Sequence, residues 1–351
     1  GWADGYRMKV THWEIWNEPN IPSFWQPKSP NAADYLELVK LTGGIIREEI
    51  PDAKIGGCTS SSGLAEWGQA FFKLGGAKAI DFWCCHAYGR VPEAYRHSQA
   101  VARVDPKRSF VVAQRAVRKI IDENGGRHVE IWQGEAGYPS WFHKDHWLFL
   151  KGVCQHGWQS QANQAKWLLR RFLTDRRAGF ARTSFYQAAD ISRLYSMATI
   201  TRPHPAEHGV LNGWTYEPKM SYFALGHYNA LFATARVDET VSVKVTPETD
   251  VDCPVQAVAF RTAAGALRFV YYVPTDYGET YVGKGYAART DATLTVPAAV
   301  APKAPVLVDL LRGGVYAVKG VEAGEKTVTY TSLPLVDYPL VLADRTQIVL
   351  K

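Results

Sequence analysis

The stretch of sequence from which the fold can be inferred is Trp13-Glu14-Ile15-Trp16-Asn17-Glu18-Pro19-Asn20. It completes a short apolar run, Val10 to Trp16, that predicts a β-strand, and a helix-like segment from Asn31 to Ile50 follows it. Asn31 can cap that helix at its start, and Pro51 ends it. A strand that leads through a polar turn into a helix is typical of an α/β unit, with the turn's polar side chains at the carboxyl end of the strand.

The same alternation continues to about residue 233. Four more apolar runs predict strands, at Lys54–Cys58, Ile80–His86, Val129–Trp132 and Arg182–Gln187. The segments between them predict helices, at Leu64–Leu74, Glu93–Asn124, Ser160–Arg177 and Pro218–Phe232. Repeated strand–helix units with apolar strands indicate a parallel sheet covered by helices, either open or closed into a barrel.

From about Arg236 the apolar residues alternate with period two instead. The clearest examples are Val241–Val245, Val255–Phe260, Leu267–Val273 and Lys326–Tyr330, separated by Pro and Gly turns. This pattern predicts antiparallel sheets in a β-sandwich. We therefore divide the chain into an α/β domain, residues 1–233, and a C-terminal β-sandwich domain, residues 234–351.

The composition is that of an ordinary globular chain of 351 residues, of which 46% are apolar and 21% charged. No apolar run approaches the roughly 18 residues that cross a bilayer, which argues against a membrane-spanning protein. The net charge of +6 is spread along the chain without a nucleic-acid-binding motif, and the densest basic cluster, Arg170 to Arg177, is most simply a solvated helix face. We therefore expect neither nucleic acid nor a membrane as a partner.

Aromatic residues are frequent, at 13% of the chain and including 12 Trp. Flat rings of this kind cover the apolar faces of sugars, although a large barrel core would also use them. The number of cysteines, five, is odd. Adjacent Cys84 and Cys85 point to opposite faces of a strand, and Cys58 could approach one of them from a neighbouring strand. We expect buried thiols, and the cysteines leave the cellular compartment open.

Two carboxylates follow predicted strands. Alternation places Glu14, Trp16 and Glu18 on one face, but the Asn17-Glu18-Pro19 turn can swing both polar side chains over the mouth of a barrel. A protonated carboxyl there is what a general acid requires, whereas the simpler interpretation is that Glu18 caps the next turn. Glu135 follows the fourth strand, between glycines that let a ligand approach the backbone.

The third strand ends in His86-Ala87-Tyr88-Gly89, where His86 and Tyr88 share parity and can reach the same mouth. Each of these alone is more often structural. Two carboxylates, a histidine and a tyrosine at three strand ends suit glycoside hydrolysis, in which one carboxyl protonates the leaving oxygen. The other attacks the anomeric carbon or activates water, and a separation of about 5–5.5 Å would mean retention through a covalent glycosyl-enzyme.

These motifs are similar to those of a known clan. The segment Trp16-Asn17-Glu18-Pro19-Asn20 resembles the acid/base motif of retaining glycoside hydrolases built on a (β/α)8 TIM barrel, where it closes strand four. Gly134-Glu135-Ala136-Gly137 resembles the nucleophile segment of strand seven, and His86-x-Tyr88 resembles the strand-six motif. The resemblance implies Glu18 as acid/base, Glu135 as nucleophile, Asn17 as a ligand of the substrate 2-hydroxyl, and Tyr88 as a hydrogen-bond donor to the nucleophile.

A later segment, Gly209 to Leu225, resembles the entry to helix eight and is most like the β-xylosidase and α-L-iduronidase family, which also carries a β-sandwich. If Glu18 closes strand four, too few residues precede Val10 to form strands one to three of a barrel of about 250 residues. We therefore expect strands four to eight of the barrel in a chain truncated at its start. The alternative is that another copy, as in a homo-oligomer, or a complementing segment covers the open edge.

Other side chains could shape a sugar subsite, although an aromatic ring at such a place is as easily packing. They are Trp16, Tyr186 at the end of the last parallel strand, and Trp214. His143 and His146 lack a third ligand, so we predict no metal site, and the expected chemistry needs no cofactor.

The sequence thus favours a retaining glycoside hydrolase that cleaves O-glycosidic bonds of a polysaccharide or its oligomers, with a carbohydrate as its partner. A secreted or periplasmic location is favoured for it, although no signal-peptide pattern follows Gly1. The competing hypothesis is a catalytically inactive carbohydrate-binding protein with a degenerate or truncated barrel.

Overall fold

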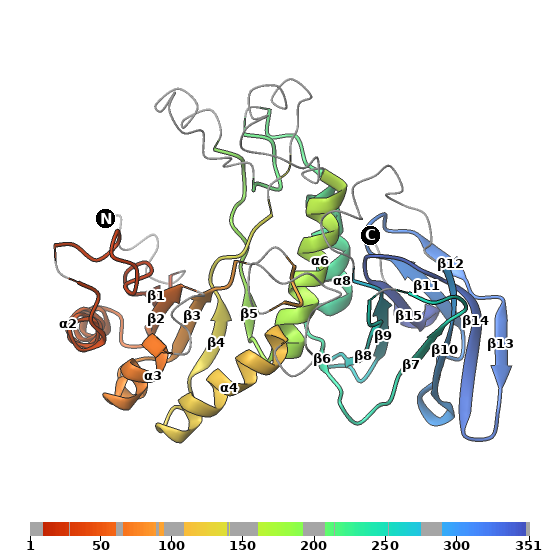
Figure 1. Ribbon diagram of the computed structural model, residues 1–351, viewed down its shortest axis with the longest axis horizontal. Coiled ribbons are helices and arrows are strands. Elements are labelled where there is room, and N and C mark those ends of the chain that lie inside the picture. The colour runs from red at the N-terminus through yellow and green to blue at the C-terminus, as the bar shows by residue number, and fades with distance from the viewer. Residues whose placement is uncertain are drawn as a thin grey trace. The chain divides into compact units, whose positions relative to one another are not determined.

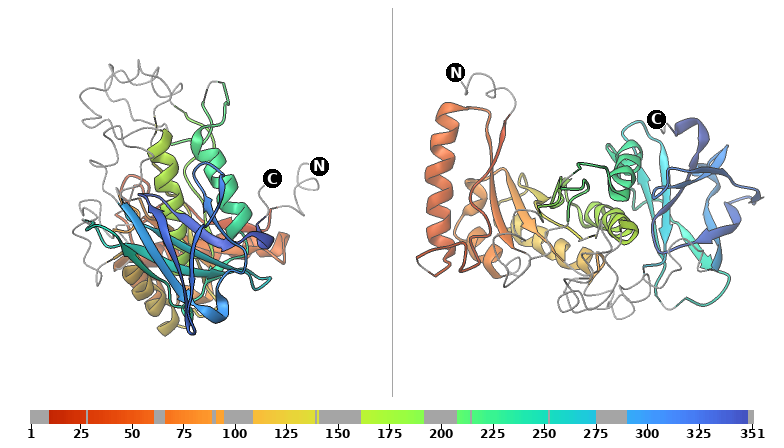
Figure 2. Two further views of the ribbon diagram at one scale, coloured as in Figure 1. Left: turned by 90° about the vertical axis from the view of Figure 1, so that its right-hand side faces the viewer. Right: turned by 90° about the horizontal axis from the view of Figure 1, so that it is seen from above.

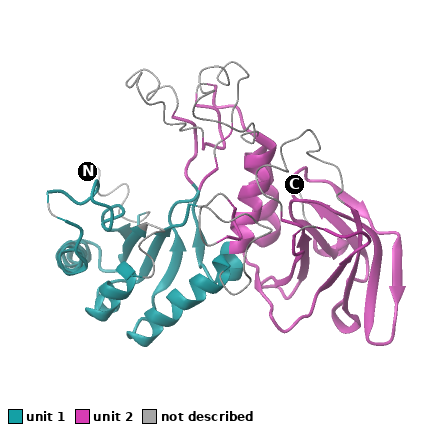
Figure 3. Ribbon diagram, in the orientation of Figure 1, with its two compact units in different colours: residues 1–89, 106–136, 175–185 teal, residues 90–105, 137–174, 186–351 magenta. Residues whose placement is uncertain are grey.

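The computed structural model of the chain describes residues 10–27, 29–60, 66–88, 91–94, 109–138, 140, 161–191, 208–213, 215–251, 253–274 and 290–348. The chain divides into two compact units, coloured separately in Figure 3. The first unit contains residues 1–89, 106–136 and 175–185, and the second contains residues 90–105, 137–174 and 186–351. Among the described residues, every helix is too short or too polar to be a membrane span.

The first unit is built on a parallel sheet of five strands that lie in chain order (Figure 1). The strands are β1 (His12–Glu14), β2 (Lys54–Ser60), β3 (Phe82–His86), β4 (Glu130–Gln133) and β5 (Arg182–Thr183). The helices between them are α2 (Ala32–Glu49), α3 (Glu66–Lys73) and α4 (Phe110–Glu123), with a short 3-10 helix, η2 (Gly76–Lys78). This arrangement confirms the predicted parallel sheet, with shorter first and last strands than the apolar runs suggested.

Alternation along the strands separates two layers of side chains in this unit. Trp83 and Ile55 belong to the core that the sheet forms with its helices, together with Tyr35 of α2 and Phe71 of α3. Cys58, Phe82 and Cys84 form a second cluster, with Trp132 packed against it. Because Cys84 and Cys85 fall in different clusters, the adjacent thiols do point to opposite faces, as expected.

The hydroxyl of Tyr35 ties helix α2 to the carboxyl ends of two strands. It donates to the carbonyl of Ile15 at 2.7 Å and accepts from the N–H of Cys58 at 2.8 Å. Asn31 caps the same helix by accepting from the N–H of Ala33 at 2.8 Å, as its place before the apolar pattern predicted. The helix thereby fixes the point at which the chain leaves β1.

The second unit contains two antiparallel sheets, drawn in teal to blue in Figure 2. The four-stranded sheet has the order β13 (Gly320–Ala323), β14 (Thr327–Leu335), β10 (Thr290–Pro297) and β7 (Lys244–Pro247). The six-stranded sheet has the order β12 (Val315–Ala317), β11 (Pro305–Asp309), β15 (Leu340–Asp344), β9 (Leu267–Tyr272), β8 (Gln256–Arg261) and β6 (Arg236–Val237). Tyr271 of the larger sheet donates to the carbonyl of Pro334 in the smaller one at 3.1 Å.

Helix α8 (Met220–Phe232) and most of α6 (Gln161–Ala178) also belong to the second unit. The division at residue 233 that the sequence predicts therefore differs from the division by compactness. The antiparallel strands themselves begin at Arg236, close to the predicted change of pattern.

Two expectations about charged segments are wrong. Glu93, at which a helix was predicted to begin, lies in a turn and is buried in an ion pair. Helix α4 begins at Phe110, and residues 95–108 lie outside the described residues. The partner of Glu93 is Arg170 in α6, whose guanidinium contacts Oε1 and Oε2 of Glu93 at 2.9 and 2.6 Å. The stretch around Arg170 is therefore not a solvated face, since Arg170 and Arg171 are both fully buried.

Candidate active site

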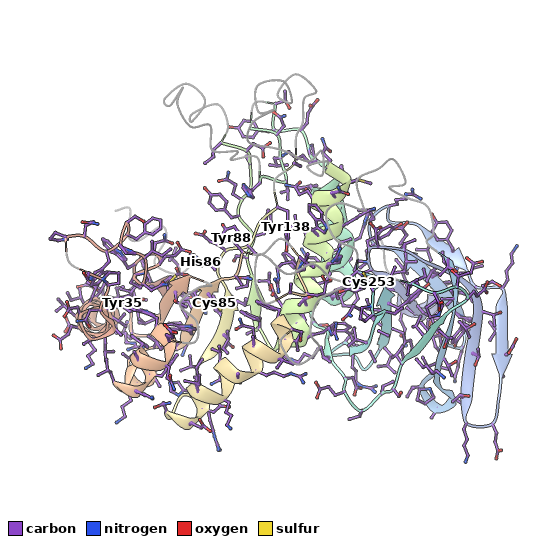
Figure 4. All side chains as sticks on the ribbon, viewed as in Figure 1. Tyr35, Cys85, His86, Tyr88, Tyr138 and Cys253 are labelled. Carbon is purple, nitrogen blue, oxygen red and sulfur yellow. The ribbon has the colours of Figure 1, made fainter. Side chains whose placement is uncertain are left out.

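The carboxyl ends of β1, β3 and β4 carry the residues that the sequence singled out. Glu18 lies four residues beyond Glu14, the last residue of β1, and its side chain turns toward His86 at the end of β3. Tyr88 follows His86, and Glu135 follows β4. Figure 4 labels His86 and Tyr88 at these strand ends. All of these residues belong to the first unit, so the structure brings Glu18, His86, Tyr88 and Glu135 together.

The turn after β1 departs from strand geometry in a way that explains this placement. Trp16 and Glu18 both have positive φ angles, 66° and 42°, a conformation that usually costs about 1–3 kcal/mol outside glycine. This backbone breaks the alternation that would have kept Trp16 and Glu18 on one face. Trp16 is 55% exposed, and its indole N–H donates to the carbonyl of Phe24 at 2.9 Å, while Asn17 is half-buried in the same turn.

His86 is the centre of the cluster and is only 2% exposed. Its Nδ1 lies 3.1 Å from Oε1 of Glu18 and 3.7 Å from Oε2 of Glu135. Its Nε2 lies 3.5 Å from Sγ of Cys58 and 3.7 Å from Oε1 of Glu14. One imidazole therefore faces three carboxylates and a thiol.

The environment of His86 keeps the imidazole positively charged. Burial works to lower its pKa, but hydrogen bonds with Cys58, Glu14 and Glu18 outweigh burial and raise the pKa to about 12. For Glu14, burial would raise the pKa, yet the hydrogen bonds of His86, Cys84 and Cys58 lower it. Burial also raises the pKa of the Cys58 thiol to about 11, so this sulfur stays protonated at neutral pH. The cluster thus holds one cation next to the carboxylate of Glu14.

Glu135 has a second partner besides His86. The hydroxyl of Tyr88 donates to Oε2 of Glu135 at 2.9 Å, the same oxygen that faces the imidazole. The side chain of Glu135 is 33% exposed and that of Glu18 is 14% exposed. Both carboxylates therefore have partners within the protein and remain partly exposed, so a ligand can reach them.

The separation of the two carboxylates follows from their shared histidine. Because an oxygen of each lies within 3.7 Å of the same Nδ1, these two oxygens are at most about 7 Å apart. Retaining glycosidases have carboxyl groups about 5–5.5 Å apart, and inverting ones roughly 6.5–9.5 Å apart. The bound lies within the range that glycoside hydrolysis requires.

The backbone of β4 is shaped to accommodate His86. A side chain at Gly134 would place its Cβ 3.0 Å from Nε2 of His86 and 3.2 Å from Sγ of Cys84, tighter than ordinary packing allows. The N–H of Gly134 instead bonds the carbonyl of Cys85 at 2.9 Å. The buried amide of Gln133 accepts from the N–H of Ala87 at 2.8 Å, which fixes the loop between His86 and Tyr88.

The remaining candidates are not part of this cluster as described. Tyr186 belongs to the second unit, where its ring contacts His208. Trp214 lies outside the described residues, as do His143 and His146. Glu14 and Cys58 also contact His86, although the sequence patterns did not indicate them. The sequence showed only the parity of Glu14, whereas the pairing of Cys58 with Cys84 is visible only in the register of the sheet.

Comparison with known proteins places this geometry in context. The family model described as "Glycosyl hydrolases family 39" matches residues 6–186, slightly more than half of the chain. A β-xylosidase from Geobacillus stearothermophilus is 25% identical over 123 residues, which are 34% of this chain and 24% of that protein. This chain thus matches about a quarter of the length of the curated relative.

Solved structures with similar folds are more distant in sequence. The family 51 α-L-arabinofuranosidase AbfB from Bifidobacterium longum superimposes with a TM-score of 0.55 at 15% identity, covering 96% of this chain and 67% of that one. An α-L-arabinofuranosidase from Thermotoga maritima gives 0.53 at 12% identity, covering 94% and 65%. These are (β/α)8 barrels with a C-terminal β domain, which confirms the predicted fold class: parallel barrel strands followed by antiparallel β-sheets.

Proposed function

Because the chain belongs to glycosyl hydrolase family 39, we propose that it cleaves O-glycosidic bonds with retention, using Glu18 and Glu135 as its catalytic pair. The observation that carries this proposal is the buried His86, which contacts a carboxylate oxygen of each glutamate. An upper bound of about 7 Å between the two carboxylates admits the 5–5.5 Å separation of a double displacement. The substrate class is a polysaccharide or its oligomers.

In the first step, a carboxylate oxygen of Glu135 attacks the anomeric carbon while the bond from that carbon to the leaving oxygen breaks. Glu18 gives its proton to the leaving oxygen. In the second step, Glu18 takes a proton from water, whose oxygen attacks the anomeric carbon and breaks the ester bond to Glu135. Both side chains return to their starting states, and the configuration at the anomeric carbon is retained.

The neighbours of the pair support these roles. The hydroxyl of Tyr88 donates to Oε2 of Glu135 and Nδ1 of His86 lies beside the same oxygen, so these contacts orient the carboxyl that acts as the nucleophile. Nδ1 of His86 faces Oε1 of Glu18 at 3.1 Å. A neutral carboxyl still accepts a hydrogen bond through its carbonyl oxygen, so Oε2 can carry the proton that is donated. In this proposal Asn17, in the same turn, binds the substrate 2-hydroxyl.

The first experiment removes the nucleophile. Because Glu135→Ala leaves no group to attack the anomeric carbon, we expect turnover of an aryl β-xyloside or another aryl glycoside to fall by more than about a hundredfold. Azide should restore part of the turnover and yield a glycosyl azide of inverted configuration, since it attacks from the face that Glu135 occupied. Glu123→Ala, which removes an exposed carboxylate on α4, is the matched control and should keep full activity.

The aryl glycosides tested should include several sugars and both anomers. Unchanged turnover of Glu135→Ala on the substrate that the unaltered chain hydrolyses would overturn the assignment. Binding of sugars without hydrolysis of any of these glycosides would support the inactive carbohydrate-binding protein instead.

A further inference from the structure

A second group of donor atoms lies on the side of His86 that faces away from the catalytic pair. Nε2 of His86 is 3.5 Å from Sγ of Cys58 and 3.7 Å from Oε1 of Glu14. Glu14, Cys58 and His86 come from the adjacent strands β1, β2 and β3, and their three donor atoms lie within 4.8 Å of one another. The proposed hydrolysis uses neither Glu14 nor Cys58.

Two of the three spacings between these atoms are those of a coordination sphere. Zinc binds sulfur at about 2.3 Å and nitrogen or oxygen at about 2.0–2.2 Å, so tetrahedral angles put its donor atoms roughly 3.3–3.7 Å apart. The two measured spacings from Nε2 fall within this range. Thiolate, imidazole and carboxylate are also the three donor types that zinc uses most often.

The surroundings supply what a metal-bound histidine needs. Such a histidine almost always uses its other ring nitrogen for a hydrogen bond to a carboxylate or carbonyl, which fixes the tautomer. Nδ1 of His86 has that partner in Glu18, at 3.1 Å. Cys58 is fixed as well, because its backbone N–H bonds the hydroxyl of Tyr35 at 2.8 Å.

A further thiol lies next to the three atoms, because the thiol of Cys84 interacts with the carboxyl of Glu14. A metal ion would also keep the local charge balanced, because Zn²⁺ would replace one proton on Cys58 and one on His86.

We propose that Glu14, Cys58 and His86 form a binding site for a zinc ion. The ion lies between the side chains that β1, β2 and β3 contribute, on the Nε2 side of His86. Binding of zinc at this site does not depend on the proposed hydrolysis.

The test uses the whole chain after removal of metals with a chelator. Titration with zinc chloride in a calorimeter should show one ion bound per chain, and cobalt in its place should give the near-ultraviolet absorption of a thiolate–cobalt bond. Cys58→Ser should weaken zinc binding by at least about a hundredfold and remove that absorption, because it deletes a ligand. Cys85→Ser is the matched control, since the thiol of Cys85 points to the other face and donates to the carbonyl of Trp132.

Three results would overturn the site. They are the absence of zinc binding at concentrations up to about 1 mM, binding that Cys58→Ser leaves unchanged, and a cobalt complex without thiolate absorption. Thermal unfolding of both serine variants checks that they are folded, and Glu14→Gln provides a second ligand variant if Cys58→Ser is not. Glu135→Ala separates this site from the proposed function, because it should lose hydrolysis but bind zinc with unchanged affinity.

Discussion

Two histidines, one in each unit, show how neighbours decide the charge of the same side chain. In the first unit, burial opposes the charge of His86, but its hydrogen-bond partners Cys58, Glu14 and Glu18 raise its pKa to about 12. In the second unit, burial and the nearby ammonium of Lys219 lower the pKa of His208 to about 4. At neutral pH the first ring is therefore a cation and the second is neutral.

The difference extends to how charges are paired around each ring. In the second unit two buried cations each pair with one carboxylate, Lys219 with Asp190 at 2.6 Å and Arg170 with Glu93 at 2.6 Å. In the first unit the single cation of His86 is shared among carboxylates. A matched pair serves stability, whereas a shared cation leaves carboxylates available to react, which is what perturbed groups at functional sites have in common.

The largest effect is expected from breaking a matched pair. Lys219→Met should lower the free energy of unfolding by about 3–5 kcal/mol, because it leaves the 7%-exposed Asp190 without its cation. Asp190→Asn in the same chain should recover most of the loss, since an amide still accepts from the N–H of Gly209. Denaturant unfolding of the two variants measures both effects. A loss below about 1 kcal/mol would mean that the Lys219–Asp190 pair does not stabilise the fold.

The next effect is expected from removing the shared cation. His86→Gln should lower kcat/KM of the proposed hydrolysis by about a hundred- to a thousandfold, because the carboxylates lose a preorganised charge that acts throughout the reaction. The loss should be mainly in kcat. Steady-state kinetics on an aryl glycoside measures it, and exposed His128→Gln is the control. Activity within about threefold of the unaltered chain would show that the charge of His86 is not used.

The sequence predicted the site in the first unit better than the buried ion pairs of the second unit. Apolar runs located all five parallel strands, and the carboxyl-end rule placed Glu18, His86, Tyr88 and Glu135 at one edge. These residues follow strands directly, so local pattern and topology suffice to bring them together. Glu14 and Cys58 were missed because their importance arises only from register: Glu14 pairs with Gly56, two residues before Cys58 in β2, and Cys58 pairs with Cys84, two residues before His86 in β3.

The second unit shows what local pattern does not reveal. Glu93 has the polarity of an exposed helix residue, but it accepts from the hydroxyl of Tyr272 at 2.9 Å and pairs with Arg170. Those partners are distant in the chain, and no periodicity identifies them. Charged residues that are buried by long-range pairing therefore mislead predictions that take charge as a sign of exposure.

A pH titration sharpens the contrast between the two histidines. Because the pKa of His208 is lowered from about 6.5 to about 4, the unfolded state binds an additional proton in this interval. The stabilisation that neutral His208 contributes is fully present above pH 6.5. It is lost as the pH falls toward 4, which lowers the free energy of unfolding by at most roughly 3 kcal/mol. The raised pKa of His86 gives the opposite sign, with stability present below about 6.5 and lost as the pH rises toward 12.

The measurement is the difference in unfolding free energy between the unaltered chain and each single variant, His208→Gln or His86→Gln, in chelator-treated protein. The difference for His208 should shrink between pH 6.5 and 4.5, and the difference for His86 should shrink between pH 7 and 9. If the two differences in unfolding free energy changed with pH in the same direction, His86 and His208 would not have opposite charge states at neutral pH.

The smallest effect separates a hydroxyl that acts on the reaction from one that only holds the fold. Tyr88→Phe removes the donor to Glu135 at 2.9 Å but leaves His86 in place, so kcat/KM should fall by about tenfold, the value of roughly one hydrogen bond to a charged group. Tyr35→Phe instead leaves the Ile15 carbonyl and the Cys58 N–H without their partner, and should lower the free energy of unfolding by about 1–3 kcal/mol. Kinetics and denaturant unfolding of both variants test this division. If Tyr88→Phe lowered the free energy of unfolding but left kcat/KM unchanged, the hydroxyl of Tyr88 would stabilise the fold as the buried ion pairs of the second unit do. His86 would then be the residue that distinguishes the first unit from the second.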